Sequence, residues 1–335
     1  MNTQKKRAFV TGASGFVGAH LVYVLLEKGY IVSALVRSQK TLNAFSALAH
    51  FYPAADSGKV EWIEGDLLSP EKWVENVAHA DVVFHAAAVV SFSPRDKRVM
   101  LETNVTGTTH VVNACLKHNP KPLVYVSSVA ALGRAEGQTE VTENTTWKDS
   151  DHNTSYAISK HLAEREVWRG MEEGLPVVVV CPGIILGPWA NPTGSGQIPA
   201  LIKKKLPFYP IGENGFVGVR DVVAMMIGLY ESGCFGERFL CVAENTTYKN
   251  VLDLFAYGFD VRPPRIALNG ALLHFLVFIA RFFEIVRIPF PFPSQGLIST
   301  SLVTRYASIR LNPVLGYSYT PLKRVVRECV DFNPY

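Results

Sequence analysis

Short apolar runs rich in β-branched residues alternate with helical patterns over the first 185 residues of the chain. Strands that alternate with helices predict a parallel sheet that is covered by helices on both faces. Right-handed crossovers between the strands make this sheet doubly wound, so we expect an α/β fold. The expected strands are residues 7–11, 31–36, 60–64, 82–86, 123–127 and 177–181.

The pattern changes after Pro182. Proline and glycine are dense from 182 to 218, which indicates long loops around short elements. A helix over 219–230 and a strand over 237–242 are expected next. We therefore expect residues 219–243 to return to the main sheet.

The chain of 335 residues is long enough for a large core and divides into two expected parts. Residues 1–185 are expected to form the domain of the main sheet. Residues 186–218 and 244–335 are expected to form a smaller, discontinuous C-terminal domain that binds the substrate. The pattern from about Tyr248 onward is helical and apolar.

The most apolar segment of the second half is 266–280, fifteen residues without a charge between Arg265 and Arg281. A helix that spans a membrane needs about 20 such residues. Arg281, Glu284 and Arg287 interrupt the helical continuation. We therefore favour a buried helix, or one that covers a substrate, over shallow contact with a membrane.

The composition is that of a globular protein, with 48% apolar and 19% charged residues. The formal net charge of +4 is too small and too dispersed to favour a nucleic-acid partner. Five scattered cysteines lack the spacing of metal ligands, so we expect reduced thiols and no metal site. Residues 1–7 are basic and lead directly into the first strand, so we expect no signal peptide and a cytoplasmic location.

A glycine-rich turn follows the first strand, and the helix expected after it ends at Gly29. A strand, a glycine turn and a helix start place backbone N–H groups and the positive end of the helix against a pyrophosphate. Gly12 can take the tight turn, Gly15 leaves room for the phosphate, and Gly18 lets the helix pack close to the strand. This arrangement predicts a dinucleotide site. Its expected contacts are Gly12, Ser14, Gly15, Phe16, Val17 and Gly18.

The spacing of this turn, T-G-x-x-G-x-x-G, resembles that of the extended short-chain dehydrogenase/reductase superfamily, which includes the NAD-dependent epimerase/dehydratase family. The resemblance implies a Rossmann fold and a nicotinamide cofactor. Arg37 follows the second strand, where NAD-specific folds usually have an acidic residue. An arginine can instead pair with a 2′-phosphate, so we favour NADP over NAD. The alternative is that Arg37 is an ordinary solvated loop residue.

Other motifs of the resemblance follow later strands. Gly65-Asp66-Leu67 is similar to a motif whose aspartate accepts a hydrogen bond from adenine, although Asp66 could instead cap a helix. The fourth strand ends in small residues, over which a cofactor could lie flat across the strand ends, and His85 before them is expected to be structural. The loop after the sixth strand is expected to pass the nicotinamide. Further expected cofactor contacts are Asp66, Leu67, Ala86, Ala87, Ala88, Pro182, Gly183 and Ile185.

Tyr156 and Lys160 are four residues apart on an expected helix and therefore share one face. A free tyrosine has a pKa near ~10 and is a poor acid–base group at neutral pH. An ammonium beside it, together with the positive nicotinamide of an oxidised cofactor, favours the phenolate. Tyr156 could then exchange a proton with a substrate oxygen while a hydride is transferred. The resemblance implies that Lys160 also holds the nicotinamide ribose.

The chain holds a second copy of this Y-x-x-x-K pattern, at Tyr319 and Lys323. Pro321 lies between the two, so a regular helix through the pair is not expected. Only the first copy follows the fifth strand, as the family requires. We therefore assign the catalytic pair to Tyr156 and Lys160.

The fifth strand leads into a segment similar to the S-S-x-x-x-x-G motif of the superfamily. Counting back from Gly133 matches Ser128 to the serine that hydrogen-bonds the substrate carbonyl. Ser127 is expected to be a cofactor or backbone contact, although the two serines could exchange roles. Asn104 matches an N-x-x-G helix of the family. It could hold the helix geometry or a water near Lys160, and a purely structural role is equally open.

These motifs imply an oxidoreductase that transfers a hydride between a nicotinamide and a carbonyl or hydroxyl group. Three features favour an NADP-dependent ketone or aldehyde reductase. They are Arg37, a second half rich in Phe, Leu and Ile, and an ending over 311–321 that resembles that of the dihydroflavonol-reductase group. Its substrate is expected to be an apolar small molecule. The alternatives are a 3β-hydroxysteroid or sterol dehydrogenase, a nucleotide-sugar epimerase or dehydratase, and a non-catalytic NADP-sensing protein. The resemblance also implies a homodimer through the helices that carry Asn104 and Tyr156.

Overall fold

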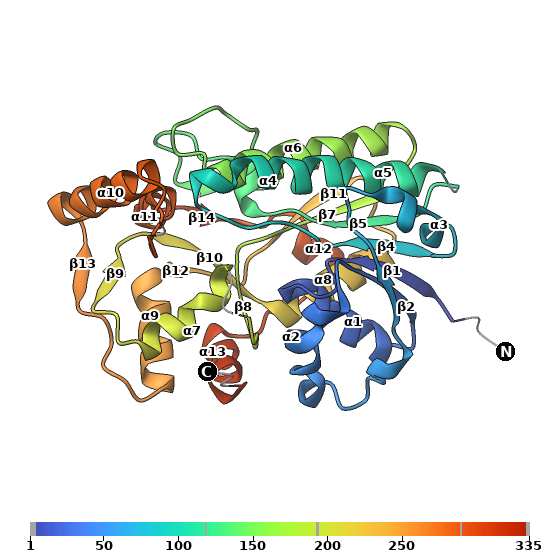
Figure 1. The fold of residues 1–335 in the computed structure, drawn as a ribbon, viewed down its shortest axis with the longest axis horizontal. Coiled ribbons are helices and arrows are strands. Elements are labelled where there is room, and N and C mark those ends of the chain that lie inside the picture. The colour runs from blue at the N-terminus through green and yellow to red at the C-terminus, as the bar shows by residue number, and fades with distance from the viewer. Residues whose placement is uncertain (1–4, 118, 192–193, 289, 333–335) are drawn as a thin grey trace.

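A computed structural model describes residues 5–117, 119–191, 194–288 and 290–332 (Figure 1). The first four residues of the basic N-terminal segment therefore lie outside the described residues. Seven strands form one sheet in the order β11-β7-β5-β4-β1-β2-β3, and every neighbouring pair is parallel. The strands are β1 (Arg7–Thr11), β2 (Ile31–Val36), β3 (Glu61–Glu64), β4 (Val82–His85), β5 (Leu123–Val126), β7 (Val177–Pro182) and β11 (Glu237–Cys241).

Helices cover both faces of this sheet, so the predicted doubly wound α/β fold is confirmed (Figure 1). Side chains alternate between the faces along each strand. Val10 packs in one core cluster, whereas its neighbour Phe9 packs in the cluster on the opposite face. One face is covered by α1 (Phe16–Glu27), α2 (Asn43–Ser46) and α8 (Val219–Glu231), and the other by α3 (Val74–Val77), α4 (Lys97–Leu101), α5 (Gly107–Lys117) and α6 (Ser155–Glu172).

The helix that enters α5 is not a regular α-helix throughout. α4 and α5 are joined by a π-helical turn over Glu102–Thr106. Turns of this kind occur frequently at functional sites, because the extra residue redirects the side chains. Asn104 lies in this turn and is buried.

The smaller part of the chain is built from short strands and helices around a core of its own. A three-stranded sheet has the order β12-β10-β8, and β13 pairs with β9. Helices α7, α9 and α13 pack their apolar side chains against these strands. The bounds are β8 (Ile184–Leu186), β9 (Phe208–Pro210), β10 (Glu213–Gly218), β12 (Glu244–Thr247), β13 (Ile266–Leu268), α7 (Gln197–Lys203), α9 (Tyr248–Gly258) and α13 (Leu322–Phe332).

The C-terminal region crosses between the two parts. β14 (Arg305–Tyr306) pairs with β6 (Glu140–Val141), and α12 (Leu311–Leu315) follows it. α13 begins at Leu322, so Tyr319 lies outside the helix. The prediction that the second Y-x-x-x-K copy is not continuous in one helix is confirmed.

The charge-free segment 266–280 divides between β13 and α10 (Gly270–Ile285). Only Val277 and Ala280 of α10 are buried, in a small cluster shared with α11 (Ser294–Ser301). The side of α10 that faces away from α11 is exposed. The expectation of a buried helix is therefore wrong for this side. The described residues include no helix that is long and apolar enough to cross a membrane.

Candidate active site

The glycine turn after β1 has a shape that fits a dinucleotide. Gly12 has a φ of +71°, and a Cβ on it would lie 2.6 Å from the Cα of Ala87. A Cβ on Gly18 would lie 2.1 Å from the Gly12 carbonyl oxygen, so α1 can pack this closely only at a glycine. Ser14, Phe16 and Val17 are half-buried in the same turn.

The start of α1 is suited to an anion. Gly15 is the N-cap, and no side chain of the described residues caps the helix there. The first turn of α1 also contains no acidic residue. Its N–H groups and the positive end of the helix dipole can therefore receive a pyrophosphate, and this fits the expected cofactor.

Two predicted adenosine contacts follow the ends of β2 and β3. Arg37 directly follows β2 and is exposed. The Leu68 amide donates to Asp66 Oδ1 at 2.9 Å, and the Trp73 indole donates to the Asp66 carbonyl oxygen at 2.8 Å. Among the described residues these contacts use only Oδ1 of the carboxylate, which leaves Oδ2 for an adenine amino group.

The loops after β4 and β7 bring small residues to the same edge of the sheet, because the carboxyl ends of parallel strands meet there. Ala86 and Ala87 lie directly against Gly12, whereas Ala88 is exposed. β7 ends at Pro182, and a Cβ on Gly183 would lie 2.4 Å from the Gly215 carbonyl oxygen. The following residues, including Ile185, turn away to pair with β10 in the second sheet.

Ser128 and Tyr156 meet where β5 leads into the 3₁₀ turn Val129–Leu132 and where α6 begins. Ser128 caps that turn by accepting a hydrogen bond from the Ala130 amide at 3.2 Å. Thr154 caps α6 by accepting from the Ala157 amide at 3.1 Å, which fixes Tyr156 in the first turn. Burial raises the pKa of Tyr156 to about 12, and a hydrogen bond with Ser128 opposes this shift.

Lys160 lies one turn later and is buried. Its ammonium donates to Tyr125 Oη at 2.6 Å and to the Val126 carbonyl oxygen at 2.8 Å. Burial lowers the pKa of Lys160 to about 7, while the charge of Glu164 raises it. The expected lowering of the Tyr156 pKa by the Lys160 ammonium is therefore not found, because burial dominates and Lys160 bonds to Tyr125 instead.

A series of buried hydrogen bonds holds Tyr125, the partner of Lys160, in place. Tyr125 is hydrogen-bonded to Thr108, whose hydroxyl donates to the Asn104 carbonyl oxygen at 2.5 Å. Thr108 Oγ1 therefore accepts from His85 Nε2 at 2.9 Å, and His85 Nδ1 accepts from Thr11 Oγ1 at 2.6 Å. Burial, aided by the Lys160 charge, lowers the pKa of His85 to about 3 and keeps it neutral. A hydrogen-bonded role for His85 agrees with its expected structural assignment.

Asn104 joins the π-helical turn to two other elements. Its Oδ1 accepts from the Val89 amide at 2.7 Å, and its Nδ2 donates to the Val89 carbonyl oxygen at 2.9 Å. Nδ2 also donates to Ser159 Oγ at 3.0 Å. The side chain therefore fixes the loop after β4 against α6, beside Lys160.

Sequence reasoning missed Glu164, the buried partner of Ser127. Ser127 Oγ donates to Glu164 Oε2 at 2.5 Å, the Trp168 indole donates to Oε1 at 3.1 Å, and Arg238 forms an ion pair with the same carboxylate. Glu164 lies four residues after Lys160, so Tyr156, Lys160 and Glu164 share one helix face. The acidic residue four positions after Lys160 was the sequence signal that could have revealed the role of Glu164.

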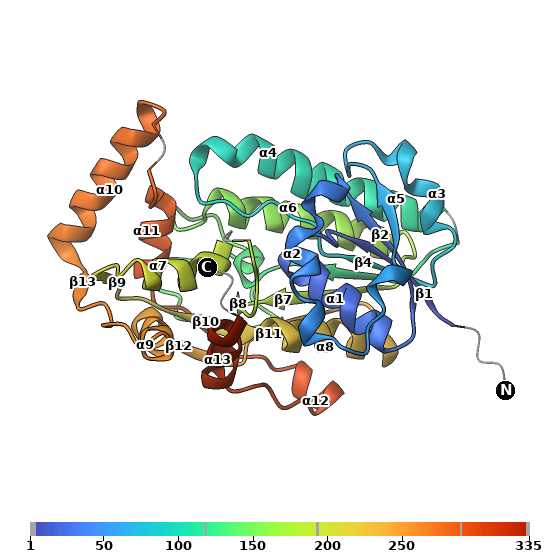
Figure 2. The same ribbon diagram turned by 60° about the horizontal axis from the view of Figure 1, so that its bottom comes forward.

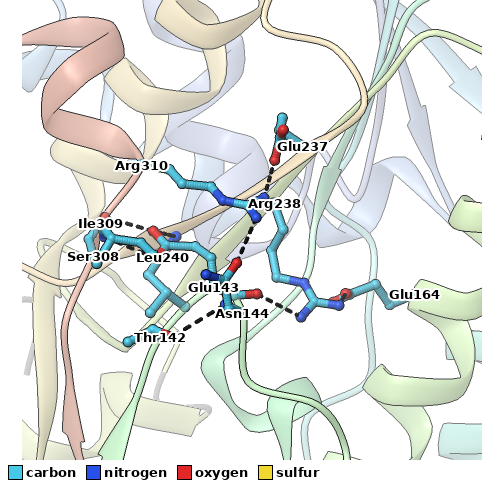
Figure 3. A network of polar contacts seen from close by, with 10 residues as sticks. All are labelled: Thr142, Glu143, Asn144, Glu164, Glu237, Arg238, Leu240, Ser308, Ile309 and Arg310. Carbon is cyan, nitrogen blue, oxygen red and sulfur yellow. Dashed lines mark hydrogen bonds and ion pairs between the residues drawn. The ribbon is translucent and has the colours of Figure 1, made fainter.

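Arg238 connects this helix to the backbone of Glu143, whose carboxylate is also buried (Figure 3). The Arg238 guanidinium donates to the Glu143 carbonyl oxygen at 3.5 Å. The Glu143 carboxylate accepts from the Leu240 amide at 3.2 Å, from Ser308 Oγ at 2.8 Å and from the Ile309 amide at 3.0 Å. A cavity of about 390 Å³ beside Arg238 includes none of the predicted site residues in its lining.

The comparisons with known proteins agree with this arrangement. A sequence model of the NAD dependent epimerase/dehydratase family matches residues 8–237. Dihydroflavonol 4-reductase of Arabidopsis thaliana is 30% identical over 264 residues, which cover 74% of this chain and 68% of that protein. Sterol demethylase protein B of Methylococcus capsulatus is 30% identical over 266 residues, which cover 79% and 78%. A crystal structure of gox2253 superimposes with a TM-score of 0.78 at 26% identity and covers 98% of both chains.

The match to the family model spans the glycine turn, the Ser128 segment and the Tyr156–Lys160 helix. Within the described ranges no cluster of His, Cys, Asp or Glu could hold a metal ion. The chain belongs to the NAD-dependent epimerase/dehydratase family of the extended short-chain dehydrogenases/reductases and is an NAD(P)-dependent oxidoreductase.

Proposed function

We propose that the protein is an NADP-dependent reductase of a ketone or aldehyde group on an apolar small molecule. The observation that carries the proposal is the hydrogen bond between Ser128 and Tyr156, with buried Lys160 one helical turn after Tyr156. All three residues lie near the carboxyl ends of the central strands. When bound, the nicotinamide supplies the hydride. The residues of the chain then have to orient the carbonyl group and provide a proton.

Tyr156 is the proposed proton donor. Its pKa of about 12 keeps the phenol protonated at neutral pH, which is the state needed to protonate a carbonyl oxygen during reduction. Ser128 is proposed to donate a hydrogen bond to the same oxygen as negative charge develops there. Lys160 is proposed to hold the ribose through its ammonium, which Tyr125 and the Val126 carbonyl oxygen position from the opposite side.

Two observations support an apolar substrate. The ring centroid of Phe92 lies 6.3 Å from that of Tyr156, and Phe92 also packs against Gly296 at the start of α11. Phe92 therefore gives the proposed proton donor an apolar neighbour, which suits an apolar carbonyl compound. The similarity to a dihydroflavonol 4-reductase favours the same class.

A sterol or 3β-hydroxysteroid substrate is the second candidate. The similarity to sterol demethylase protein B and the exposed apolar face of α10 favour it. It would use the same three residues, because oxidation of a hydroxyl group is the reverse of carbonyl reduction. A panel of flavonoid, steroid and short aliphatic carbonyl compounds, followed by the absorbance of NADPH, separates the candidates. Turnover confined to short polar aldehydes would contradict both.

The preference for NADP rests on Arg37, which can pair with a 2′-phosphate. Titration of the protein should show tighter binding of NADPH than of NADH. Replacing Arg37 in R37A should weaken NADPH binding by about tenfold and leave NADH binding nearly unchanged. R98A removes an exposed arginine from α4 and serves as the matched control. Equal affinities of the unmodified protein for the two nucleotides would overturn the NADP assignment.

A further inference from the structure

α10 has an apolar face that no described part of the chain covers. Phe275, Phe278, Phe282 and Ile285 are three or four residues apart and therefore share one side of the helix. Their exposed fractions are 59, 70, 55 and 79%. Ile288, just after the helix, is also exposed. A continuous apolar surface of this kind marks an interaction site.

The length and composition of α10 restrict what can cover this face. The helix is apolar on both sides, because Val277 and Ala280 are buried against the α11 region. An apolar helix face is normally buried, in protein or in lipid, and the outer face of α10 is not buried by the described residues. With 16 residues α10 is about 24 Å long, which is shorter than the bilayer core. It can therefore lie in the plane of a membrane surface but not span the membrane.

The exposed charges around the face are basic. Arg281 borders the apolar stripe and Arg287 follows the helix, and both are exposed. Glu284, the acidic residue of α10, accepts hydrogen bonds from the Ser294 amide at 2.8 Å and from Ser294 Oγ at 2.9 Å. Its charge is therefore used to hold the start of α11. The surface that surrounds the phenylalanines is complementary to anionic headgroups.

The position of α10 also suits a flat surface. Figure 1 and Figure 2 both show it at the outer end of the molecule, at the opposite end from the N-terminus, with α11 on its inner side. A two-fold contact with a second copy would bring the same arginines of both chains around one apolar patch, and like charges there would repel. An anionic bilayer has no such conflict.

We propose that α10 is an interfacial helix that docks the protein on an anionic lipid bilayer. Phe275, Phe278, Phe282 and Ile285 enter the boundary between headgroups and acyl chains, and Arg281 and Arg287 contact lipid phosphates. This reverses the preference for a buried helix that the sequence suggested. The proposal rests on the exposed apolar face and the arginines beside it, and it does not depend on the proposed reductase activity.

Two contacts connect the docking helix to the candidate active site. Arg95, in the loop after β4, donates to the carbonyl oxygens of Phe283 at 2.8 Å and Glu284 at 3.0 Å. On α11, Gln295 Oε1 accepts from the Ser155 amide at 3.0 Å, next to Tyr156. A docked α10 therefore places this side of the site close to the bilayer, where apolar compounds concentrate.

The test is co-sedimentation of the full chain with vesicles of phosphatidylcholine and phosphatidylglycerol. The unmodified protein should pellet with these vesicles. The variant F278S/F282S should reduce the bound fraction by about tenfold, because it removes the two central apolar side chains. F235S changes an exposed phenylalanine between α8 and β11 and should pellet like the unmodified protein. Circular dichroism melting and NADPH binding show that each variant is folded.

The charge component is tested separately. R281E/R287E should weaken binding to the mixed vesicles, and added salt should have the same effect on the unmodified protein. Absence of pelleting by the unmodified protein, or equal pelleting by F278S/F282S, would overturn the proposal. A lipid-free dimer that F278S/F282S dissociates in sedimentation velocity would also overturn it, in favour of a second copy as the occupant.

Discussion

Two helices of similar length, α6 and α10, distribute polar and apolar side chains in opposite ways. α6 buries Ser159, Lys160 and Glu164 in the interior of the protein. α10 exposes Phe278 and Ile285 to solvent and buries only two of its residues. Both depart from the usual arrangement of apolar residues inside and polar residues outside.

The reason for the departure differs between the helices. Each buried polar group of α6 has partners: Lys160 has Tyr125 and the Val126 carbonyl oxygen, and Glu164 has Ser127 and Arg238. Such groups are costly unless they are paired, so the sheet must supply the partners at the right places. α10 lacks a covering element among the described residues, so its outer face points to something outside the chain. Buried polar groups thus mark the proposed chemistry, and exposed apolar groups mark the proposed docking.

The largest effect is expected at Tyr156 on α6. Y156F keeps the ring and removes the proton donor, so carbonyl reduction should slow by about 10²- to 10⁴-fold. NADPH binding should stay within about twofold, because the ring still fills its place. The measurements are steady-state turnover with the best substrate of the carbonyl panel and titration with NADPH.

Tyr319 provides the control for this change, because it belongs to the other Y-x-x-x-K copy. Y319F should keep turnover close to that of the unmodified protein. Loss of turnover in Y319F, or its persistence in Y156F, would mean that the assignment of the proton donor is wrong.

The second effect is expected at Glu164, four residues after Lys160. E164Q removes the charge that pairs with Arg238 inside the protein, so the free energy of unfolding should fall by about 3 kcal/mol. E75Q changes the exposed pair of Glu75 with Lys117 and should cost less than about 1 kcal/mol. Urea denaturation monitored by tryptophan fluorescence measures both.

E164Q should also change the titration of Lys160. The Glu164 charge raises the pKa of Lys160, so its removal should shift that pKa further below about 7. The protonated lysine would then disappear at a lower pH, and the pH profile of cofactor binding should move in the acid direction. An unchanged profile would show that Glu164 supports the fold without tuning Lys160.

The smallest effect is expected on α10. F278A removes a side chain that is already exposed, so the stability should change by no more than about 0.5 kcal/mol. F255A removes a buried phenylalanine from α9 and should cost about 3–5 kcal/mol. Urea denaturation compares the two. A large loss in F278A would mean that the apolar face of α10 is packed in solution, and the contrast with α6 would disappear.

Local patterns were sufficient to predict the main sheet, because most of its strands are short apolar runs bounded by turns. The shifts were small: the strand expected over 60–64 begins at Glu61, and the one expected over 177–181 extends to Pro182. The glycine turn was equally local, since Gly12, Gly15 and Gly18 lie within seven residues. The proposed roles of the site residues stay predictions, which the variants above test.

The contacts that position these residues were not visible in the sequence. Tyr125 holds Lys160 across 35 positions, and Glu143 joins Ser308 across 165 positions. Neither distance follows from a periodicity, because it depends on which strands become neighbours in the sheet. The exposure of α10 was also unpredictable, since an apolar run looks the same whether protein or solvent surrounds it.

The sequence by itself determined the strand and helix order, the nucleotide-binding turn and the spacing of Tyr156, Lys160 and Ser128, because all of these depend on residues close together in the chain. Only the tertiary structure decided that Lys160 is held by Tyr125, that Glu164 is paired with Arg238, and that α10 faces outward. The physical reason is that burial and pairing depend on the neighbours of a side chain in space, and those are contributed by segments far apart in the sequence.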